Sequence, residues 1–156
     1  MVDSRMEVLL ATNRLSARIS TSFESWTGSS ISRFAILYAL STSSSLPQTE
    51  IRSLLGINAS AVTRHLQYLE DRGLITRKRV PGDQRNVAVT ITQNGMSLIV
   101  GCSDKRESLL DTLFEGSGHN QIQVLLATVS AIESRLDQAA SACNESAPTS
   151  PKPPHS

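Results

Sequence analysis

The chain is poor in cysteine: it has only two, Cys102 and Cys143, with no Cys-x-x-Cys pair or Cys/His cluster. This scarcity argues against a disulfide framework or a zinc site and favours a reducing compartment. The sequence also has no apolar run near the roughly 20 residues that span a bilayer, and no basic leader followed by an uninterrupted apolar segment. We therefore expect a cytoplasmic protein with no membrane partner.

Common enzyme motifs are absent as well. The sequence contains no Gly-x-Ser-x-Gly, no phosphate-binding P-loop and no His-Glu-x-x-His. His65 and His119 are isolated from other ligand residues, so no metal site is expected. The 156 residues are enough to bury the core of one domain. We predict a protein that is not an enzyme and that needs no cofactor.

Charge is unevenly distributed, although the net charge is only +1. Residues 46–92 carry seven basic and four acidic side chains, whereas residues 93–156 carry four basic and seven acidic ones. The net charge therefore says little about a polyanionic partner, but a basic segment in the middle of the chain is compatible with one.

Helical periodicity extends through both ends of the chain. An amphipathic helix is predicted from Ser4 to about Phe23, and a short, mostly apolar helix over 31–40 that a polar loop, 41–45, follows. Beyond the middle segment we expect a long helix after Thr92, weakened at two glycines, and then an apolar helical stripe over 121–140. The last residues are rich in proline and serine and are predicted to be disordered.

The middle of the chain predicts two short helices joined by a tight turn. The first, PQTEIRSLLG, ends at Gly56, which can adopt the left-handed conformation of a helix C-terminus. The second begins at Asn58, a good N-cap, and ends near Gly73. Two helices joined in this way form a helix-turn-helix.

Two segments rich in β-branched residues follow, 74–80 and 86–92, with Pro81 to Arg85 between them as a hairpin loop. Helix, turn, helix and hairpin make a winged helix. The predicted fold class is mainly α with a small β-hairpin wing.

The second helix of a helix-turn-helix enters the DNA major groove. Its exposed side here is expected to carry Asn58, Ser60, Thr63, Arg64 and Gln67. Arg64 suits a bidentate contact to guanine and Gln67 or Asn58 one to adenine, while Ser60 or Thr63 suits a phosphate or a thymine methyl group. Polar residues on a lone outer helical face are usually just solvated, but the adjoining turn and cationic hairpin favour DNA recognition.

The hairpin carries Arg77, Lys78, Arg79 and Arg85, which can neutralise phosphates. An arginine at its tip suits a narrow minor groove, where negative potential is concentrated. Asp83 would repel phosphate if it pointed outward, so we expect it to pair with Arg85 or Arg79 and to fix the direction of the guanidinium.

The pattern VTRHLQYLEDRGLITRKRVPGDQRNVAVTITQNG, residues 62–95, resembles the MarR family of bacterial transcription regulators. The resemblance implies a winged helix-turn-helix homodimer on double-stranded DNA, with 58–67 in the major groove and Arg85 of the Asp-x-Arg motif in the minor groove. A two-fold dimer implies a pseudo-palindromic operator with half-sites about one helical turn apart. Two departures are Arg52, where such proteins have a small residue, and a wing tip with a single aspartate.

The expected organisation has three parts. Residues 1–45 and 93–142 form a helical dimerisation region, because their apolar stripes exceed what a winged helix can cover. Residues 46–92 form the winged helix-turn-helix lobe, and residues 143–156 form a disordered tail.

The resemblance also implies a repressor that a small, often aromatic ligand releases from DNA. Candidate pocket residues are Phe23, Trp26, Phe34 and Tyr38, although aromatic residues at helical spacing more often belong to a core. Two alternatives stay open: a redox-sensing regulator that uses Cys102, and a winged helix that binds protein. The acidic neighbours of Cys102 and the cationic wing argue against them.

Overall fold

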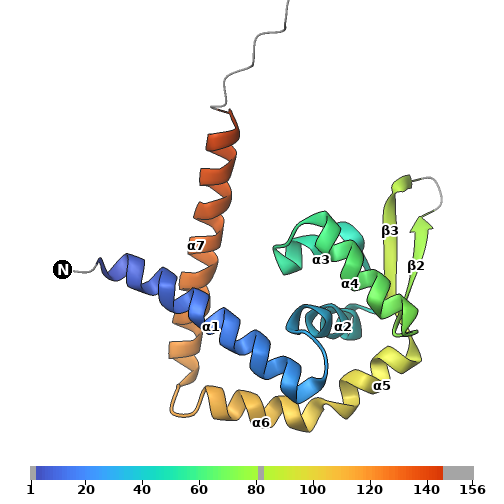
Figure 1. Cartoon of the computed structure of the whole chain (residues 1–156), viewed down its shortest axis with the longest axis horizontal. Helices are drawn as coiled ribbons and strands as arrows, with labels where there is room; N and C mark the ends of the chain where they lie inside the picture. The colour runs from blue at the N-terminus through green and yellow to red at the C-terminus, as the bar shows by residue number, and fades with distance from the viewer. Residues whose placement is uncertain (1–2, 81–82, 146–156) are drawn as a thin grey trace, which may run out of the picture. The chain divides into compact units, whose positions relative to one another are not determined.

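The computed structural model describes residues 3–80 and 83–145, apart from the side chains of Trp26 and of residues 80, 83–86 and 142–145. The elements, coloured along the chain in Figure 1, are α1 (Ser4–Thr27), α2 (Ile31–Ser43), β1 (Ser45–Pro47), α3 (Gln48–Leu55), α4 (Ala59–Asp71), β2 (Ile75–Val80), β3 (Asp83–Ile91), α5 (Gln93–Gly101), α6 (Ser103–Leu113) and α7 (His119–Glu145). The chain forms two compact units that divide after Leu109, within α6. The helix-turn-helix and all three strands belong to the first unit, and α7 belongs to the second.

Helix α2 contributes most to the core of the first unit, because its sequence is apolar on more than one side. Ile36, Leu37 and Leu40 are almost completely buried. Phe34 of the same helix is also buried. Around these residues lie buried apolar side chains from the neighbouring elements: Phe23, Ile51, Val62, Leu66, Leu69, Ile75, Val89 and Ile99. Burying one side chain of this size stabilises a fold by about 1.5–3 kcal/mol. The helix-turn-helix and the sheet are thus held on one shared core.

The helix-turn-helix predicted around Gly56 is confirmed. Helix α3 stops at Gly56, whose φ of 60° lies in the left-handed region that glycine adopts readily. Asn58 then caps α4, since its side chain accepts a hydrogen bond from the backbone N–H of Ala61 at 2.9 Å. Arg52 is exposed, so its side chain stays outside the contact between the two helices.

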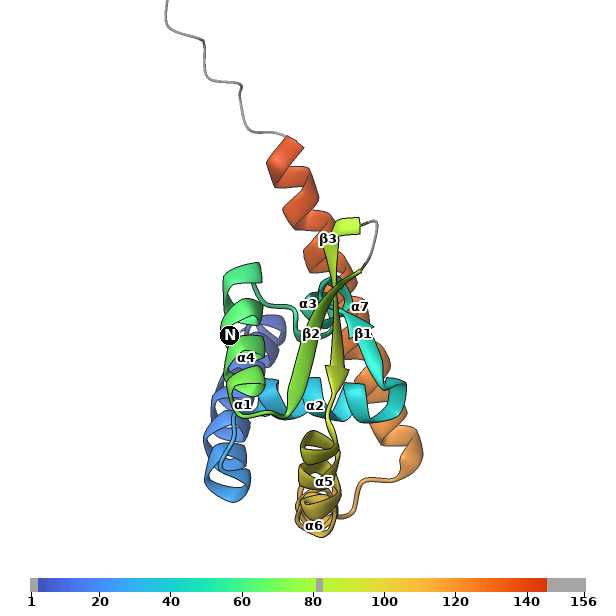
Figure 2. The same cartoon turned by 90° about the vertical axis from the view of Figure 1, so that its right-hand side faces the viewer.

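The wing belongs to a three-stranded antiparallel sheet ordered β1-β3-β2 (Figure 2). Strand β3 starts at Asp83, earlier than the predicted residue 86, and Val80 pairs with Asp83. Strand β3 is therefore longer, and the connection shorter, than predicted, whereas β2 starts one residue later, at Ile75. Strand β1 was not predicted, because the sequence around it reads as a polar loop, yet Leu46 pairs with Val89.

Several helix boundaries also differ from the prediction. Helix α1 continues to Thr27, since Gly28 is the first residue in a left-handed conformation, and α2 continues to Ser43. The long helix expected after Thr92 is two helices, α5 and α6, separated at Cys102.

Helix α7 runs to Glu145 and so includes the first three residues of the segment 143–156 that we expected to be disordered. Residues 146–156 lie outside the described part of the chain.

Gly95 marks a close approach between α5 and the base of the wing. It is buried, and a Cβ atom there would overlap the backbone oxygen of Leu74 and lie 2.8 Å from Cγ1 of Ile91. The Thr92 hydroxyl donates to the carbonyl of Gly73 at 2.6 Å and accepts from the N–H of Gly95 at 3.1 Å. The start of α5 is therefore fixed against the turn that follows α4.

The first and last helices each expose a row of large apolar side chains. About half of the surface of each is accessible: Met6, Leu9 and Leu10 on α1, and Leu125, Leu126, Val129 and Leu136 on α7. Val8, Leu15 and Val124 are similarly exposed but lie on other sides of these helices. Among the helices of residues 3–80 and 83–145, none combines the length and the apolar character needed to cross a membrane.

Candidate nucleic-acid interface

The outward side of α4 and its N-cap presents the side chains that were predicted to read DNA. All five are exposed: Asn58, Ser60, Thr63, Arg64 and Gln67. The Asn58 side chain caps the helix, and the Thr63 hydroxyl donates to the carbonyl of Ala59 at 2.9 Å. Arg64 has no hydrogen-bond or ion-pair partner within the part of the chain that the structure describes. Of the five, Arg64 therefore has the most donors available for a base or a phosphate.

Gln67 and Arg77 belong instead to an internal network that joins α4 to β2. The Glu70 carboxylate accepts from the backbone N–H of Arg77 at 3.1 Å, from its Nε at 2.9 Å and from its Nη2 at 2.5 Å. Arg77 Nη2 also donates to Gln67 Oε1 at 2.6 Å, and Gln67 Nε2 donates to Asp71 Oδ1 at 2.7 Å. The hydrogen bonds from the Arg77 side chain lower the pKa of Glu70. The charge of Arg77 is thus compensated within the chain.

Two further cations of the wing, Lys78 and Arg79, are exposed on β2. Asp83 and Arg85 lie in β3, but their side chains are outside the described part of the chain. The pairing of Asp83 with Arg85 or Arg79, and the approach of Arg85 to a minor groove, therefore stay predictions.

Basic groups also gather around α4 next to the core. The guanidinium carbon of Arg33 lies 3.5 Å from the ring centroid of Tyr68, and that of Arg72 lies 4.4 Å from it. Burial, followed by the positive charges of Arg33 and Arg64, lowers the pKa of His65 and so favours its neutral form. The positive charge next to this helix therefore comes from arginines of α2 and α4 and from the C-cap residue Arg72.

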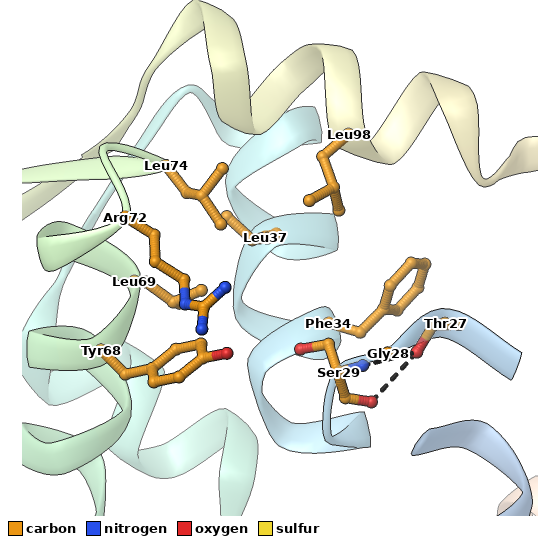
Figure 3. Close-up of a pocket in the computed structure, with 10 residues that line it drawn as sticks. All are labelled: Thr27, Gly28, Ser29, Phe34, Leu37, Tyr68, Leu69, Arg72, Leu74 and Leu98. Atoms are coloured by element: carbon orange, nitrogen blue, oxygen red, sulfur yellow. Dashed lines mark hydrogen bonds between the residues drawn. The ribbon is translucent and has the colours of Figure 1, made fainter. Parts of the chain in front are cut away.

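A cavity of about 220 Å³ opens beside Tyr68 in the first unit (Figure 3). Its lining comes from the α1–α2 turn, α2, α4, the turn between α4 and β2, and α5. The residues are Thr27, Gly28, Ser29, Phe34, Leu37, Tyr68, Leu69, Arg72, Leu74 and Leu98. Figure 3 shows Arg72 reaching over the Tyr68 ring, and the Tyr68 hydroxyl directed toward Ser29 and Phe34. Apolar walls with a few polar groups are typical of a site for a small molecule.

Of the four aromatic residues predicted to line a ligand pocket, Phe34 lines this cavity. Phe23 is buried in the core and packs edge-on against Phe34, with ring centroids 4.9 Å apart. Tyr38 is 47% exposed and stacks on Phe34 away from the lining. The Trp26 side chain is outside the described part of the chain.

Cys102 is half-buried at the junction of α5 and α6, where it packs against the core. It is a free thiol. Residues 3–80 and 83–145 contain no group of three or more His, Cys, Asp or Glu side chains that could hold a metal ion.

The sequence-based prediction missed Glu70, Asp71, Tyr68 and Arg72. Two signals could have found three of them. Glu70 and Arg77 carry opposite charges on either side of the turn at Gly73. Tyr68 and Arg72 are four residues apart and so share one face of a helix.

The geometry defines a class of protein. A helix-turn-helix on a shared core, with an exposed second helix and an adjoining antiparallel hairpin that carries cations, is a winged helix-turn-helix, a DNA-binding fold. The sequence profile of the MarR family matches residues 30–87. Over 130 residues the chain is 32% identical to the HTH-type transcriptional regulator YdgJ of Bacillus subtilis (strain 168), which covers 83% of this chain and 72% of YdgJ. The chain belongs to the MarR family of transcriptional regulators.

Solved structures show the same fold. NMB1585, a MarR family regulator from Neisseria meningitidis, superimposes with a TM-score of 0.77 at 18% identity, covering 90% of this chain and 98% of that one. BpsR of Bordetella bronchiseptica, whose DNA binding is regulated by 6-hydroxynicotinic acid, superimposes with a TM-score of 0.69 at 19% identity, covering 81% and 98%. The predicted fold class is confirmed.

Proposed function

We propose that this MarR-family regulator is a sequence-specific repressor that binds a pseudo-palindromic operator as a homodimer. The observation that carries the proposal is Arg64, exposed on the outward face of α4 with its donors available, in the same lobe as the exposed wing cations Lys78 and Arg79. Arg64 suits a guanine edge, and the wing cations suit phosphates. Arg85 takes the minor-groove position in this proposal, and Asp83 directs it.

The apolar rows on α1 and α7 support the homodimer. Isolated surface leucines are ordinary, but rows of half-exposed apolar residues along two separate helices are typical of a surface that a second protein covers. A second copy of the chain is the economical partner, because two identical winged helices suit two half-sites related by a two-fold axis.

A salt titration of promoter DNA tests DNA recognition directly. We expect the logarithm of the binding constant for a duplex from the protein's own promoter to fall linearly with the logarithm of salt concentration. Replacing Arg85 with alanine should weaken binding about tenfold and make the salt slope shallower by about two, one contact for each subunit of the dimer. Fluorescence anisotropy measures both quantities.

The control is Lys105→Ala, which removes one positive charge from an exposed position on α6. It should leave affinity and slope close to those of the wild type. Binding of the wild type with no salt dependence and no preference over random DNA would contradict the proposed function.

We also propose that a small aromatic acid binds the cavity beside Tyr68 and weakens operator binding. The cavity combines the Arg72 guanidinium with apolar walls, and about 220 Å³ suits a one-ring molecule. Tyr68 lies in α4 and Arg72 is the C-cap residue of that helix, so a ligand that contacts them acts directly on the helix that carries Arg64. The regulation of BpsR by 6-hydroxynicotinic acid gives the first compound to try.

Binding in the cavity is expected to raise the melting temperature. A ligand at tenfold its dissociation constant contributes about 1.4 kcal/mol, which corresponds to roughly 3–5 °C for a chain of this size. Differential scanning fluorimetry with 6-hydroxynicotinic acid and with benzoate measures the shift. The uncharged benzamide and the variant Arg72→Gln serve as controls and should give little shift. Equal shifts with benzoate and benzamide would contradict recognition of the acid by Arg72.

A further inference from the structure

Two side chains of α4 contact one residue of the wing, and a third side chain of α4 contacts one of the two. Glu70, Gln67 and Asp71 lie in the second half of α4, and Arg77 lies in β2. The four side chains form one continuous chain of hydrogen bonds, from Asp71 through Gln67 and Arg77 to Glu70. We name this chain of four residues the helix-to-wing brace.

The brace supplies a hydrogen-bond acceptor to a backbone N–H group of β2 that has no partner in the sheet. Strand β2 lies at an edge of the sheet, so the outward N–H groups of this strand have no strand partner. The backbone N–H of Arg77 donates to Oε1 of Glu70, while the Arg77 guanidinium donates to Oε2 of the same carboxylate. Glu70 therefore fixes both the main chain of β2 and the direction of the Arg77 side chain.

Arg77 and Gln67, which the sequence predicted to contact DNA, are poorly placed to do so. The Arg77 side chain is only 19% exposed, and its Nε and Nη2 already donate to Glu70 and Gln67. The Gln67 amide would need both Oε1 and Nε2 for a bidentate contact to adenine, and both are occupied within the brace.

We infer that Glu70 and Arg77 are positioning residues, which fix the wing relative to the recognition helix and so set the distance between the two parts that contact DNA. This inference rests on the proposed function, because it assigns a role in operator binding. A pre-positioned wing avoids the entropy cost of ordering it when DNA binds. The brace contributes through this geometry and adds no contact to DNA.

The inference makes a prediction opposite in sign to that of simple electrostatics. Replacing Glu70 with glutamine removes a negative charge from a DNA-binding lobe, which by Coulomb attraction alone should strengthen binding to DNA. If Glu70 positions the wing, Glu70→Gln should instead weaken operator binding about tenfold, the scale of a lost hydrogen bond to a charged group. The salt slope should stay unchanged, because the number of phosphate contacts is unchanged.

Arg77→Lys is the second variant that tests the inference. Lysine keeps the charge, and therefore a phosphate contact, but lacks the planar fork that binds Glu70 and Gln67 together. We expect this variant to weaken binding about as much as Glu70→Gln, and the double variant to be little weaker than either single one, because the two residues act as a unit.

The experiment measures operator affinity by fluorescence anisotropy at several salt concentrations for the wild type, Glu70→Gln, Arg77→Lys and the double variant. The matched control is Glu50→Gln, which removes a carboxylate from the first turn of α3, where it is exposed. This variant should bind as tightly as the wild type or more tightly. Circular dichroism at the assay temperature verifies that each variant is folded. If Glu70→Gln is unfolded, the operator affinity of Arg77→Lys alone tests the inference.

Weaker binding by the brace variants at an unchanged salt slope supports the inference. Wild-type affinity for Arg77→Lys, or a Glu70→Gln variant that binds as tightly as Glu50→Gln, would overturn it while the proposed function stands. A wild type that binds no promoter DNA would instead overturn the proposed function, and with it the role of the brace in DNA binding.

Discussion

Replacing Gly95 with alanine is expected to lower the free energy of unfolding by about 3 kcal/mol or more, in the upper range for overpacking a core. The added methyl group would overlap the backbone oxygen of Leu74 and approach Cγ1 of Ile91. Backbone cannot move aside as a flexible side chain can, so α5 must separate from the base of the wing. Thermal and urea denaturation followed by circular dichroism measure the loss.

The matched control is Gly101→Ala, six residues further along α5. A Cβ atom at Gly101 would have no neighbour within 4 Å. The same change there should be neutral or stabilising by about 0.5–1 kcal/mol, because alanine favours a helix over glycine. Equal stabilities for the two variants would contradict the close packing described at Gly95.

Replacing Leu125 with aspartate should separate the proposed homodimer into single chains of 16.9 kDa. Leu125 is 55% exposed within one chain, so the change should leave the fold of the chain intact while it places a charge in the apolar row of α7. Operator affinity should fall about 100-fold or more, because two linked half-site contacts become independent ones. Size-exclusion chromatography with light scattering gives the mass, and anisotropy gives the affinity.

Gln123→Asp is the control for this change. Gln123 lies two residues away on the same helix, is exposed, and falls outside the apolar row. This variant should have the mass and affinity of the wild type. If Leu125→Asp kept twice the chain mass, α7 would not form the dimer interface.

The elements that were predictable from sequence are those that local patterns determine. The helix-turn-helix followed from the apolar spacing of Val62, Leu66 and Leu69 and from a glycine and an asparagine at the turn, and all three apolar residues are buried. The hairpin followed from its β-branched residues. The identity of the recognition face followed in turn, since the side opposite the buried stripe must be exposed.

The elements that were missed depend on contacts between distant residues. Strand β1 has only three residues, and it exists because Ser45 to Pro47 lie along β3, with Ser45 opposite Thr90. Likewise, the involvement of Arg77 with Glu70 depends on how β2 returns past α4. The aromatic residues proposed for a pocket were chosen by residue type alone, yet Phe23 is buried in the core and Tyr38 lies at the surface.

The hydroxyl of Thr92 has a consequence for how this protein can diverge. Through its hydrogen bonds to Gly73 and Gly95, it brings together the two points at which the wing leaves and rejoins the helical body. The residues between those points enter and exit the structure at one place, while Ile75, Val89 and the contact of Arg77 with Glu70 hold the inner half of the hairpin on the core and on α4. Only the outer part of the hairpin can therefore change in length or charge without loss of these contacts, which separates operator preference from the architecture that supports it.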